Sequence, residues 1–300
     1  MQRRNLLLCF DAFGTLFRPI RPVAQQYAEV ARQCGFGSFS DHELQSSFRS
    51  AIKQEGKKNP NYGKSTGLGA TKWWTNVIHN TFTPFLKDSQ PLPRDLAPRL
   101  LHRFASKDGY DTEPNLVSTL QSLGRHKSQM GFENVIVGVI TNSDDRVPGI
   151  LSSFGLNVSP LRSSTGIDPR TVPNQDYDID FHCMSYDAGV EKPDELIFHA
   201  AEFMLTQVLA VRGKGVGEII GSTGSWHKVY VGDDFAKDVL GAKKAGWDPV
   251  LLDAEDQFTD LPRLKDSPSM TLDSLYEEHA AVRVRSIADL VTWLTAGTRR

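Results

Sequence analysis

The amino-acid sequence predicts an α/β fold, a doubly wound, Rossmann-like parallel sheet with a block of helices inserted after its first strand. In the segment 6–16, LLLCFDAFGTL, an apolar run leads directly to Asp11 and then to a Gly-Thr turn. A second apolar run, 135–140, ends at Thr141, and a third, 229–231, is followed by Gly-Asp-Asp. Such runs are typical of buried central strands. In open α/β sheets the chemistry lies just beyond the carboxyl ends of the strands, so Asp11 is placed like a nucleophile.

Composition narrows the kind of protein and its setting. The chain has 300 residues, enough for an α/β core and a small accessory domain, and a formal net charge of −2 at pH 7. It carries no clustered basic face, which argues against nucleic acid as an obligate partner. The three cysteines, Cys9, Cys34 and Cys183, are widely spaced, which favours reduced thiols and a cytoplasmic location. Because no apolar run approaches the roughly 18 residues of a membrane span, we expect no membrane partner.

Between residues 19 and 112, apolar residues recur at helical spacing, and no central strand is evident. The second helix expected here has Ser40 or Asp41 as its cap. The expected helices are one within 22–36 that closes at Gly35, and three more over 41–54, 71–81 and 96–104. The predicted organisation is a discontinuous core domain, 1–18 and 113–300, with a helical cap domain, 19–112, inserted into it.

Three segments outside the predicted sheet carry expectations of their own. Segments 159–180 and 211–226 are rich in small and polar residues and predict long surface loops. The apolar spacing of 287–294 predicts a final helix that packs at the edge of the sheet.

A pair of tryptophans, Trp73 and Trp74, follows a glycine-rich stretch in the insertion. We expect one of them to pack inside the cap and the other to cover the boundary between cap and core. In an alternative interpretation, which the sequence leaves open, Asn61 and Tyr62 face the substrate.

Four motifs occur in a fixed order along the chain. They are DAFGTL beginning at Asp11, the apolar run ending at Thr141, GVEKPDELIFHAAEFM containing Lys192, and VGDDFAKD containing Asp233. Together they resemble the haloacid dehalogenase (HAD) superfamily, whose first motif is D-x-D-G-T-[LV]. The resemblance implies that the insertion is the C1 cap of subfamily I. It also implies that Asp11 attacks phosphorus or carbon of a small anionic substrate to give a covalent aspartyl intermediate.

The resemblance implies a Mg²⁺ site. Asp11 and Asp233 supply carboxylate ligands, and the backbone carbonyl of Phe13 supplies a third ligand. Asp238 occupies the family's GDxxxxD position, which implies that it holds a metal-bound water or orients the site. Asp234 either shares the metal or caps the helix that follows, and we favour the cap.

The resemblance also implies an anion site beside the metal. Lys192 neutralises the nucleophile and the transferred oxygens as a point charge, and the Thr141 hydroxyl binds those oxygens. Asn142 follows in the position of a polar contact with the substrate. Asp144 and Asp145 read instead as caps of the next helix.

The residue two positions after the nucleophile departs from the family's phosphatase pattern. Phosphatases of the family carry an aspartate there, which protonates the leaving group and later deprotonates the hydrolytic water. Phe13 can do neither. Haloacid dehalogenases carry an aromatic residue at this position, usually tyrosine, but they need no metal and lack the Gly-Asp pair that this chain keeps at Gly232 and Asp233.

We therefore expect a HAD-like hydrolase that uses an aspartate nucleophile and Mg²⁺ on a small phosphorylated or otherwise activated substrate. Two alternatives stay open. One is a weakly active or inactive HAD protein that binds a ligand or a partner. The other is a metal-free hydrolase resembling the 2-haloacid dehalogenases.

Overall fold

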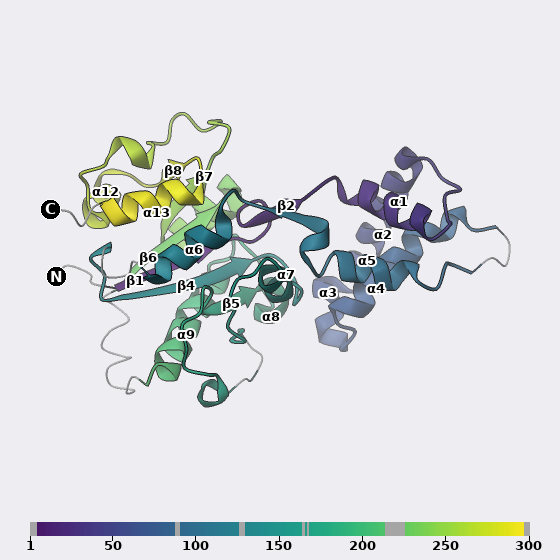
Figure 1. Cartoon of the computed structure of the whole chain (residues 1–300), viewed down its shortest axis with the longest axis horizontal. Helices are drawn as coiled ribbons and strands as arrows, with labels where there is room; N and C mark the ends of the chain where they lie inside the picture. The colour runs from purple at the N-terminus through teal and green to yellow at the C-terminus, as the bar shows by residue number, and fades with distance from the viewer. Residues whose placement is uncertain are drawn as a thin grey trace. The chain divides into compact units, whose positions relative to one another are not determined.

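Six parallel strands form the sheet of the computed structural model, which describes residues 5–87, 91–125, 130–163, 166, 168–213 and 226–296 (Figure 1). The strand order is β5-β4-β1-β6-β7-β8, and all neighbouring pairs run parallel. The strands are β1 (Asn5–Phe10), β4 (Asn134–Thr141), β5 (Phe181–Met184), β6 (Trp226–Gly232), β7 (Asp248–Leu252) and β8 (Val282–Val284).

Strand β1 lies at the centre of the sheet, where all six of its residues are buried. Its last residue, Phe10, is in register with Val139 of β4 on one side and with Val231 of β6 on the other. Asp11 continues this pairing by donating its backbone N–H to the Val231 carbonyl at 2.8 Å. Because the three strands are parallel, the residues that follow them emerge at the same edge of the sheet.

Helices cover both faces of this sheet. Helix α9 (Glu195–Val211) buries Ile197 and Phe198 in an apolar cluster with side chains of β1, β4, β5 and β6. Helices α6 (Leu116–Arg125) and α13 (Ile287–Ala296) pack against each other on the opposite side (Figure 1). The smaller helical segments are α8 (Ser185–Ala188), the π-helix η7 (Phe235–Leu240), α11 (Gly241–Lys244) and α12 (Leu272–Glu278). The predicted doubly wound α/β fold is confirmed, as is the C-terminal helix.

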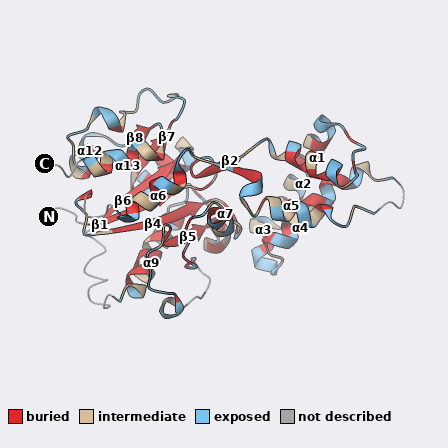
Figure 2. Cartoon of the chain, viewed as in Figure 1, coloured by how far each residue is buried: buried red, intermediate tan, exposed pale blue. Residues whose placement is uncertain are grey.

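Most described residues of the segment 159–180 are exposed or half-buried, as the predicted surface loop requires, but a few apolar side chains anchor it to the core. Leu161, Val172 and Ile179 are buried, and the first two belong to the apolar cluster that α9 covers. Strand β4, which contributes to the same cluster, has the colour of buried residues along most of its length in Figure 2. The polar and small residues around them dominate the local composition and hide these isolated apolar positions. Of the second predicted loop, residues 214–225 lie outside the described residues.

A second compact unit consists of residues 19–111 and 144–153. Its helices are α1 (Val23–Gln33), α2 (Asp41–Lys58), α3 (Pro60–Gly63), α4 (Ala70–Phe82), α5 (Leu96–Arg103) and α7 (Val147–Ser153). The four helices predicted for the insertion are confirmed, although α2 continues to Lys58 instead of ending at residue 54. Ser40 is the cap of α2, in a capping box with Glu43. The chain passes between the two units through a short two-stranded sheet, β2 (Phe17–Pro19) and β3 (Tyr110–Thr112).

The interior of the helical unit is built from aromatic rings. The Tyr27 ring centroid lies 4.7 Å from that of Phe48 and 5.5 Å from that of Phe104, and all three side chains are buried. Trp73 is buried too, as expected of one tryptophan of the pair, and its Nε1 donates to the Asn59 carbonyl at 3.0 Å. In the part of the chain that the structure describes, no helix is long and apolar enough to cross a membrane.

The segment 144–153 packs with the helical unit, whereas the predicted boundaries put it in the core. Trp74 Nε1 donates to Asp144 Oδ2 at 2.8 Å. The Arg146 guanidinium lies 4.3 Å from the Trp74 ring centroid and pairs with the same carboxylate at 2.8 Å. The Asp144 side chain was expected to cap the next helix. Its Oδ1 accepts the Arg146 backbone N–H at 3.1 Å just before α7 begins, and the carboxylate also contacts the side chains of Trp74 and Arg146. The Asp144 carboxylate is fully buried, so it needs a positive partner.

His182, on β5, is a buried histidine whose surroundings favour the neutral ring. Its side chain is fully buried, and within the described residues neither ring nitrogen has a hydrogen-bond partner. Burial lowers the pKa of His182 to about 3, against about 6.5 for an unfolded chain. Between these two values the unfolded chain binds a proton that the folded chain does not bind, so the folded state loses stability as the pH falls.

We therefore expect the free energy of unfolding to fall more steeply with acidification in the wild type than in a His182→Leu variant. The difference in slope should approach about 1.4 kcal/mol per pH unit between about pH 6 and pH 4. Urea unfolding of both proteins across this range measures it. Parallel profiles would show that His182 is not held neutral in the folded protein.

Candidate active site

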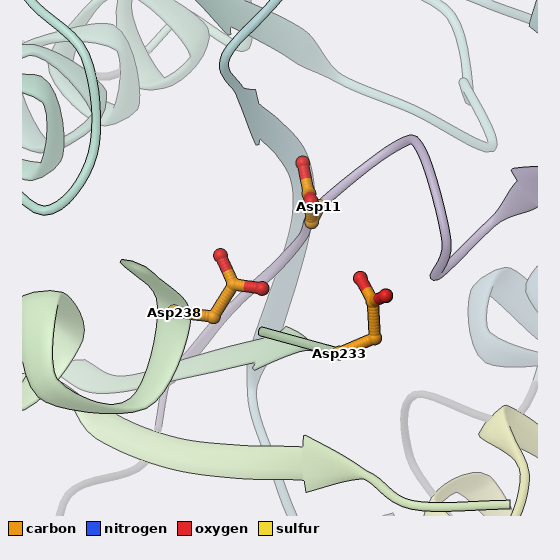
Figure 3. A group of neighbouring side chains, drawn as sticks. All are labelled: Asp11, Asp233 and Asp238. Carbon is orange, nitrogen blue, oxygen red and sulfur yellow. The ribbon is translucent and has the colours of Figure 1, made fainter. Parts of the chain in front are cut away.

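Three carboxylates meet at the edge of the sheet where β1 and β6 end. Asp11 follows β1, Asp233 follows β6, and Asp238 lies in the π-helix that comes next (Figure 3). One oxygen from each lies within 4.8 Å of the others. Figure 3 shows the three side chains converging on a common space. The pairing register of the two strands is the cause, because it carries both chain segments to the same level.

Two glycines make room for this convergence. Gly14 has a φ of +88°, and a Cβ on it would lie 2.2 Å from Asp233 Oδ2. A Cβ on Gly232 would lie 2.2 Å from Asp238 Oδ2. Any side chain at either position would therefore displace a carboxylate. Beside Gly14, the Thr15 hydroxyl donates to Asp233 Oδ1 at 3.2 Å.

Lys192 provides a buried positive charge between two of the carboxylates. Its Nζ lies 2.9 Å from Asp11 Oδ1 and 2.7 Å from Asp238 Oδ1. The same ammonium donates to the Tyr230 hydroxyl at 2.7 Å, and that hydroxyl donates to the Ile140 carbonyl at 2.8 Å. The ammonium is therefore held on several sides at once.

Tyr230 is a site residue that the sequence did not predict. It lies in the middle of β6, where the pattern shows only a buried strand. Burial, and then the charge of Asp238, raise the pKa of Tyr230 well above its usual range, so the hydroxyl keeps its proton. The available signal was a hydroxyl within an apolar run, two residues before Gly232, but that pattern alone does not specify its partner.

Asn142 forms two hydrogen bonds with the backbone of Lys192. Its Nδ2 donates to the Lys192 carbonyl at 2.9 Å, and its Oδ1 accepts from the Lys192 backbone N–H at 2.7 Å. The resemblance implied a polar contact with the substrate for this side chain. Thr141, at the end of β4, is buried immediately before it.

Asp234 and Asp238 both accept backbone hydrogen bonds at the start of the π-helix, but with different partners. The Asp234 carboxylate accepts the backbone N–H groups of Ala236 and Lys237, both at 3.0 Å, so the favoured interpretation of Asp234 as a helix cap is confirmed. Asp238 Oδ2 accepts the Asp234 backbone N–H at 2.9 Å. Both oxygens of Asp238 are thus in hydrogen bonds or ion pairs with the protein.

The site carries more negative than positive charge. Partial burial, and then the charges of Asp11 and Asp238, raise the pKa of Asp233 to about 6. Hard carboxylate oxygens at this spacing suit Mg²⁺, which prefers oxygen ligands and usually binds one or two carboxylates. A cation between Asp11 and Asp233 would relieve the repulsion that raises this pKa, so the residues present fit the metal.

Phe13, two residues after Asp11, carries an apolar ring. Its ring packs edge-on against Phe17, with centroids 4.7 Å apart. The turn between them is closed by the Gly14 backbone N–H, which donates to the Phe17 carbonyl at 2.9 Å. The position two residues after Asp11 therefore holds a phenyl ring, which has no proton to donate.

Comparison with known proteins identifies the family. A model of haloacid dehalogenase-like hydrolases matches residues 6–246, and the chain belongs to this family. An uncharacterised hydrolase of Schizosaccharomyces pombe is 31% identical over 252 residues, which is 84% of this chain and 92% of that protein. Haloacid dehalogenase-like hydrolase domain-containing protein 3 of Danio rerio is 29% identical over 247 residues, 82% of this chain and 84% of that one. The predicted resemblance is confirmed.

Solved structures share the fold. A 2-haloacid dehalogenase from Pseudomonas syringae matches with a TM-score of 0.52 and 18% identity, covering 96% of this chain and 97% of that chain. An L-2-haloacid dehalogenase matches with a TM-score of 0.54 and 14% identity, covering 97% of this chain and 99% of that chain. At these identities the likeness shows the α/β core with its helical insertion and nothing of the reaction.

Removing the buried ammonium should destabilise the protein. Lys192→Met leaves Asp11 and Asp238 without their cation, and we expect the free energy of unfolding to fall by roughly 3 kcal/mol. The control is Lys237→Met, which breaks the exposed pair with Asp234 and should change it by no more than about 0.5 kcal/mol. Urea unfolding at neutral pH measures both. Equal losses would mean that the buried ion pairs of Lys192 contribute no more to the free energy of unfolding than the exposed pair of Lys237.

Proposed function

We propose that this protein hydrolyses a small phosphorylated or otherwise activated compound, with Asp11 as the nucleophile and Mg²⁺ as the cofactor. The observation that carries the proposal is the convergence of Asp11, Asp233 and Asp238 within 4.8 Å. Attack of a carboxylate on a phosphoryl group brings two anions together, so positive charge must be supplied at that point. Mg²⁺ bound by Asp11, Asp233 and the Phe13 carbonyl would supply it.

The nucleophile's surroundings indicate which of its oxygens reacts. Asp11 Oδ1 accepts the Ala12 backbone N–H at 2.8 Å and lies beside Lys192 Nζ. We therefore assign attack to Oδ2. Lys192 and the Thr141 hydroxyl bind the oxygens of the transferred group in this proposal. Asn142 and Asp238 position Lys192, the first through its backbone and the second through its ammonium.

The phenyl ring of Phe13 restricts the leaving groups that the carboxylate cluster can displace without another proton donor. A leaving group that departs as a stabilised anion, such as an aryl or acyl oxygen, needs little protonation. An alkoxide needs a proton, and Phe13 has none to give. Substrates with activated leaving groups therefore fit this cluster best.

The helical unit is proposed to act as a cap that excludes water during the reaction, with the expected boundaries 19–112. Asn61 and Tyr62 both have a positive φ, 47° and 56°, which non-glycine residues rarely adopt. Such backbone is retained mainly where function or packing requires it. The Tyr62 ring packs edge-on against Trp73 at 5.2 Å and also contacts Trp74. This aromatic group supports the interpretation that the loop shapes a ligand-binding surface.

A second candidate is metal-free attack on carbon, as in a 2-haloacid dehalogenase. Phe13 favours it, because such enzymes resemble this chain in carrying an aromatic residue there and because halide leaves without a proton. The grouping of Asp233 and Asp238 with Asp11 favours the metal-dependent reaction instead. Metal dependence therefore separates the two candidates.

A hydrolysis panel tests the proposal. We expect the wild type to hydrolyse an aryl phosphate and an acyl phosphate in the presence of Mg²⁺ and to lose this activity in EDTA. Asp11→Asn should abolish it, since an amide is neither a competent nucleophile nor an anionic ligand. Metal-independent release of halide from a 2-haloacid would favour the dehalogenase candidate. No turnover of any compound would favour a protein that binds a ligand or partner without catalysis.

A further inference from the structure

The chain passes from the core unit into the helical unit directly after the residues that end β4. Residues 141–143 belong to the core unit, and residues 144–153 belong to the helical unit. This passage is separate from the one through β2 and β3. Thr141, whose hydroxyl is proposed to bind the transferred group, therefore lies three residues before a segment that packs with the helical unit.

Hydrogen bonds within the core unit fix the turn 141–143. The Ser143 backbone N–H donates to the Thr141 carbonyl at 3.0 Å. The Ser143 carbonyl accepts the Tyr186 backbone N–H at 3.0 Å and the Ser185 hydroxyl at 3.3 Å. The path of the chain after Thr141 therefore depends on the orientation of the Ser143 carbonyl.

Asp144, the next residue, is bonded to the helical unit. Trp74 on α4 donates its Nε1–H to Asp144 Oδ2 at 2.8 Å. Arg146 donates to the two oxygens of the same carboxylate at 2.8 and 2.9 Å, and its Nη1 donates to the Phe104 carbonyl at 3.4 Å. The Asp144 side chain is fully buried, which strengthens these bonds because little water competes for them.

The segment 144–153 is bonded to the helical unit at its other end as well. The Lys107 backbone N–H donates to Ser153 Oγ at 2.7 Å. Helix α7 fills the segment between Asp144 and this bond. Because both of its ends are bonded to residues of the helical unit, we expect the segment to move together with that unit.

A single peptide group connects the two sets of hydrogen bonds. The Ser143 carbonyl, which is bonded to the core, and the Asp144 Cα belong to the same planar group, which resists bending. Asp144 Oδ1 also accepts the Arg146 backbone N–H at 3.1 Å, which restricts the backbone dihedral angles that could absorb a displacement of Asp144. A displacement of Asp144 with the helical unit therefore shifts the Ser143 carbonyl and the turn before it.

We propose that Trp74, acting through Asp144 and Arg146, is a positioning residue for the turn 141–143, and this rests on the proposed function. Trp74 holds Asp144, and Asp144 sets the orientation of the Ser143 carbonyl. The helical unit thereby controls how strongly the turn binds the transferred group. Such coupling is reciprocal, so an anion bound at Thr141 also changes the surroundings of the Trp74 indole.

The binding test uses two tryptophan variants of the full-length protein. Trp74→Phe keeps an aromatic face for Arg146 and removes the N–H that Asp144 accepts. The matched control is Trp293→Phe, because Trp293 is half-buried like Trp74 and its Nε1 donates to the Ser267 carbonyl at 2.9 Å within the core unit.

Calorimetric titration with orthophosphate in the presence of Mg²⁺ measures the anion site in each protein. We expect the Kd for orthophosphate to rise by about tenfold in Trp74→Phe, since a misplacement of about 1 Å can cost up to about a hundredfold. In Trp293→Phe we expect the Kd to stay within about twofold of the wild-type value. Urea unfolding checks that both variants are folded.

Tryptophan fluorescence provides a readout that a merely structural role of Trp74 would not change. Orthophosphate with Mg²⁺ should alter the emission of the wild type and of Trp293→Phe, and this change should be lost in Trp74→Phe. Ser185→Ala leaves Trp74 untouched but removes a donor from the Ser143 carbonyl on the core side. We expect the fluorescence change to be smaller in this variant at saturating orthophosphate, because the link to the turn is weakened.

Three results would overturn the positioning role while leaving the proposed function intact. They are an equal Kd in Trp74→Phe and Trp293→Phe, a fluorescence change that survives in Trp74→Phe, and a wild type that hydrolyses an aryl phosphate but does not bind orthophosphate. An undiminished change in Ser185→Ala would overturn the assigned route through Ser143. A wild type that neither binds orthophosphate nor hydrolyses an aryl phosphate would overturn the proposed function, and this proposal with it.

Discussion

The active site depends on one electrostatic constraint: three carboxylates lie within 4.8 Å of one another, and a single buried ammonium offsets part of their charge. Carboxylates at this distance repel, and burial makes the repulsion stronger. Partial burial, and then the neighbouring charges, raise the pKa of Asp233 to about 6. Several neighbouring residues keep these charged groups in place. Tyr230 and Asn142 hold Lys192, and Gly14 leaves space for Asp233. A divalent cation is the natural completion of such a cluster.

The sheet is what makes so unfavourable a cluster possible. Parallel strands in register carry Asp11, Thr141 and Asp233 to a common edge, and the apolar packing of the strands stabilises the arrangement. Hydrophobic burial spread over the whole core offsets the local repulsion at its edge. The same logic explains the buried Lys192, because an ammonium with two carboxylates and a hydroxyl as partners tolerates loss of water. The charged cluster at this edge therefore depends on the stability of the packed sheet.

The strands and the helical insertion could be predicted, because apolar runs and helical periodicity are local properties of the sequence. The meeting of Asp11 with Asp233 was implied only by the resemblance to the HAD family, since the pairing of two distant strands is not a local property. The partner of Asn142 could not, since two segments separated by fifty residues had to be placed against each other. Tyr230 was missed because a strand-interior hydroxyl has no pattern of its own. The buried positions of Leu161, Val172 and Ile179 were hidden by the polar residues around them.

The most direct test of the account is calorimetric titration of Mg²⁺ into the protein without substrate. The account predicts that the wild type binds one ion and that Asp233→Asn does not bind measurably, because the variant loses an anionic ligand and the repulsion that favours a cation. Asp234→Asn, altered one residue away at the helix cap, should bind like the wild type, since asparagine also caps helices. Failure of the wild type to bind Mg²⁺, or equal binding by all three proteins, would contradict the claim that these carboxylates form a metal site.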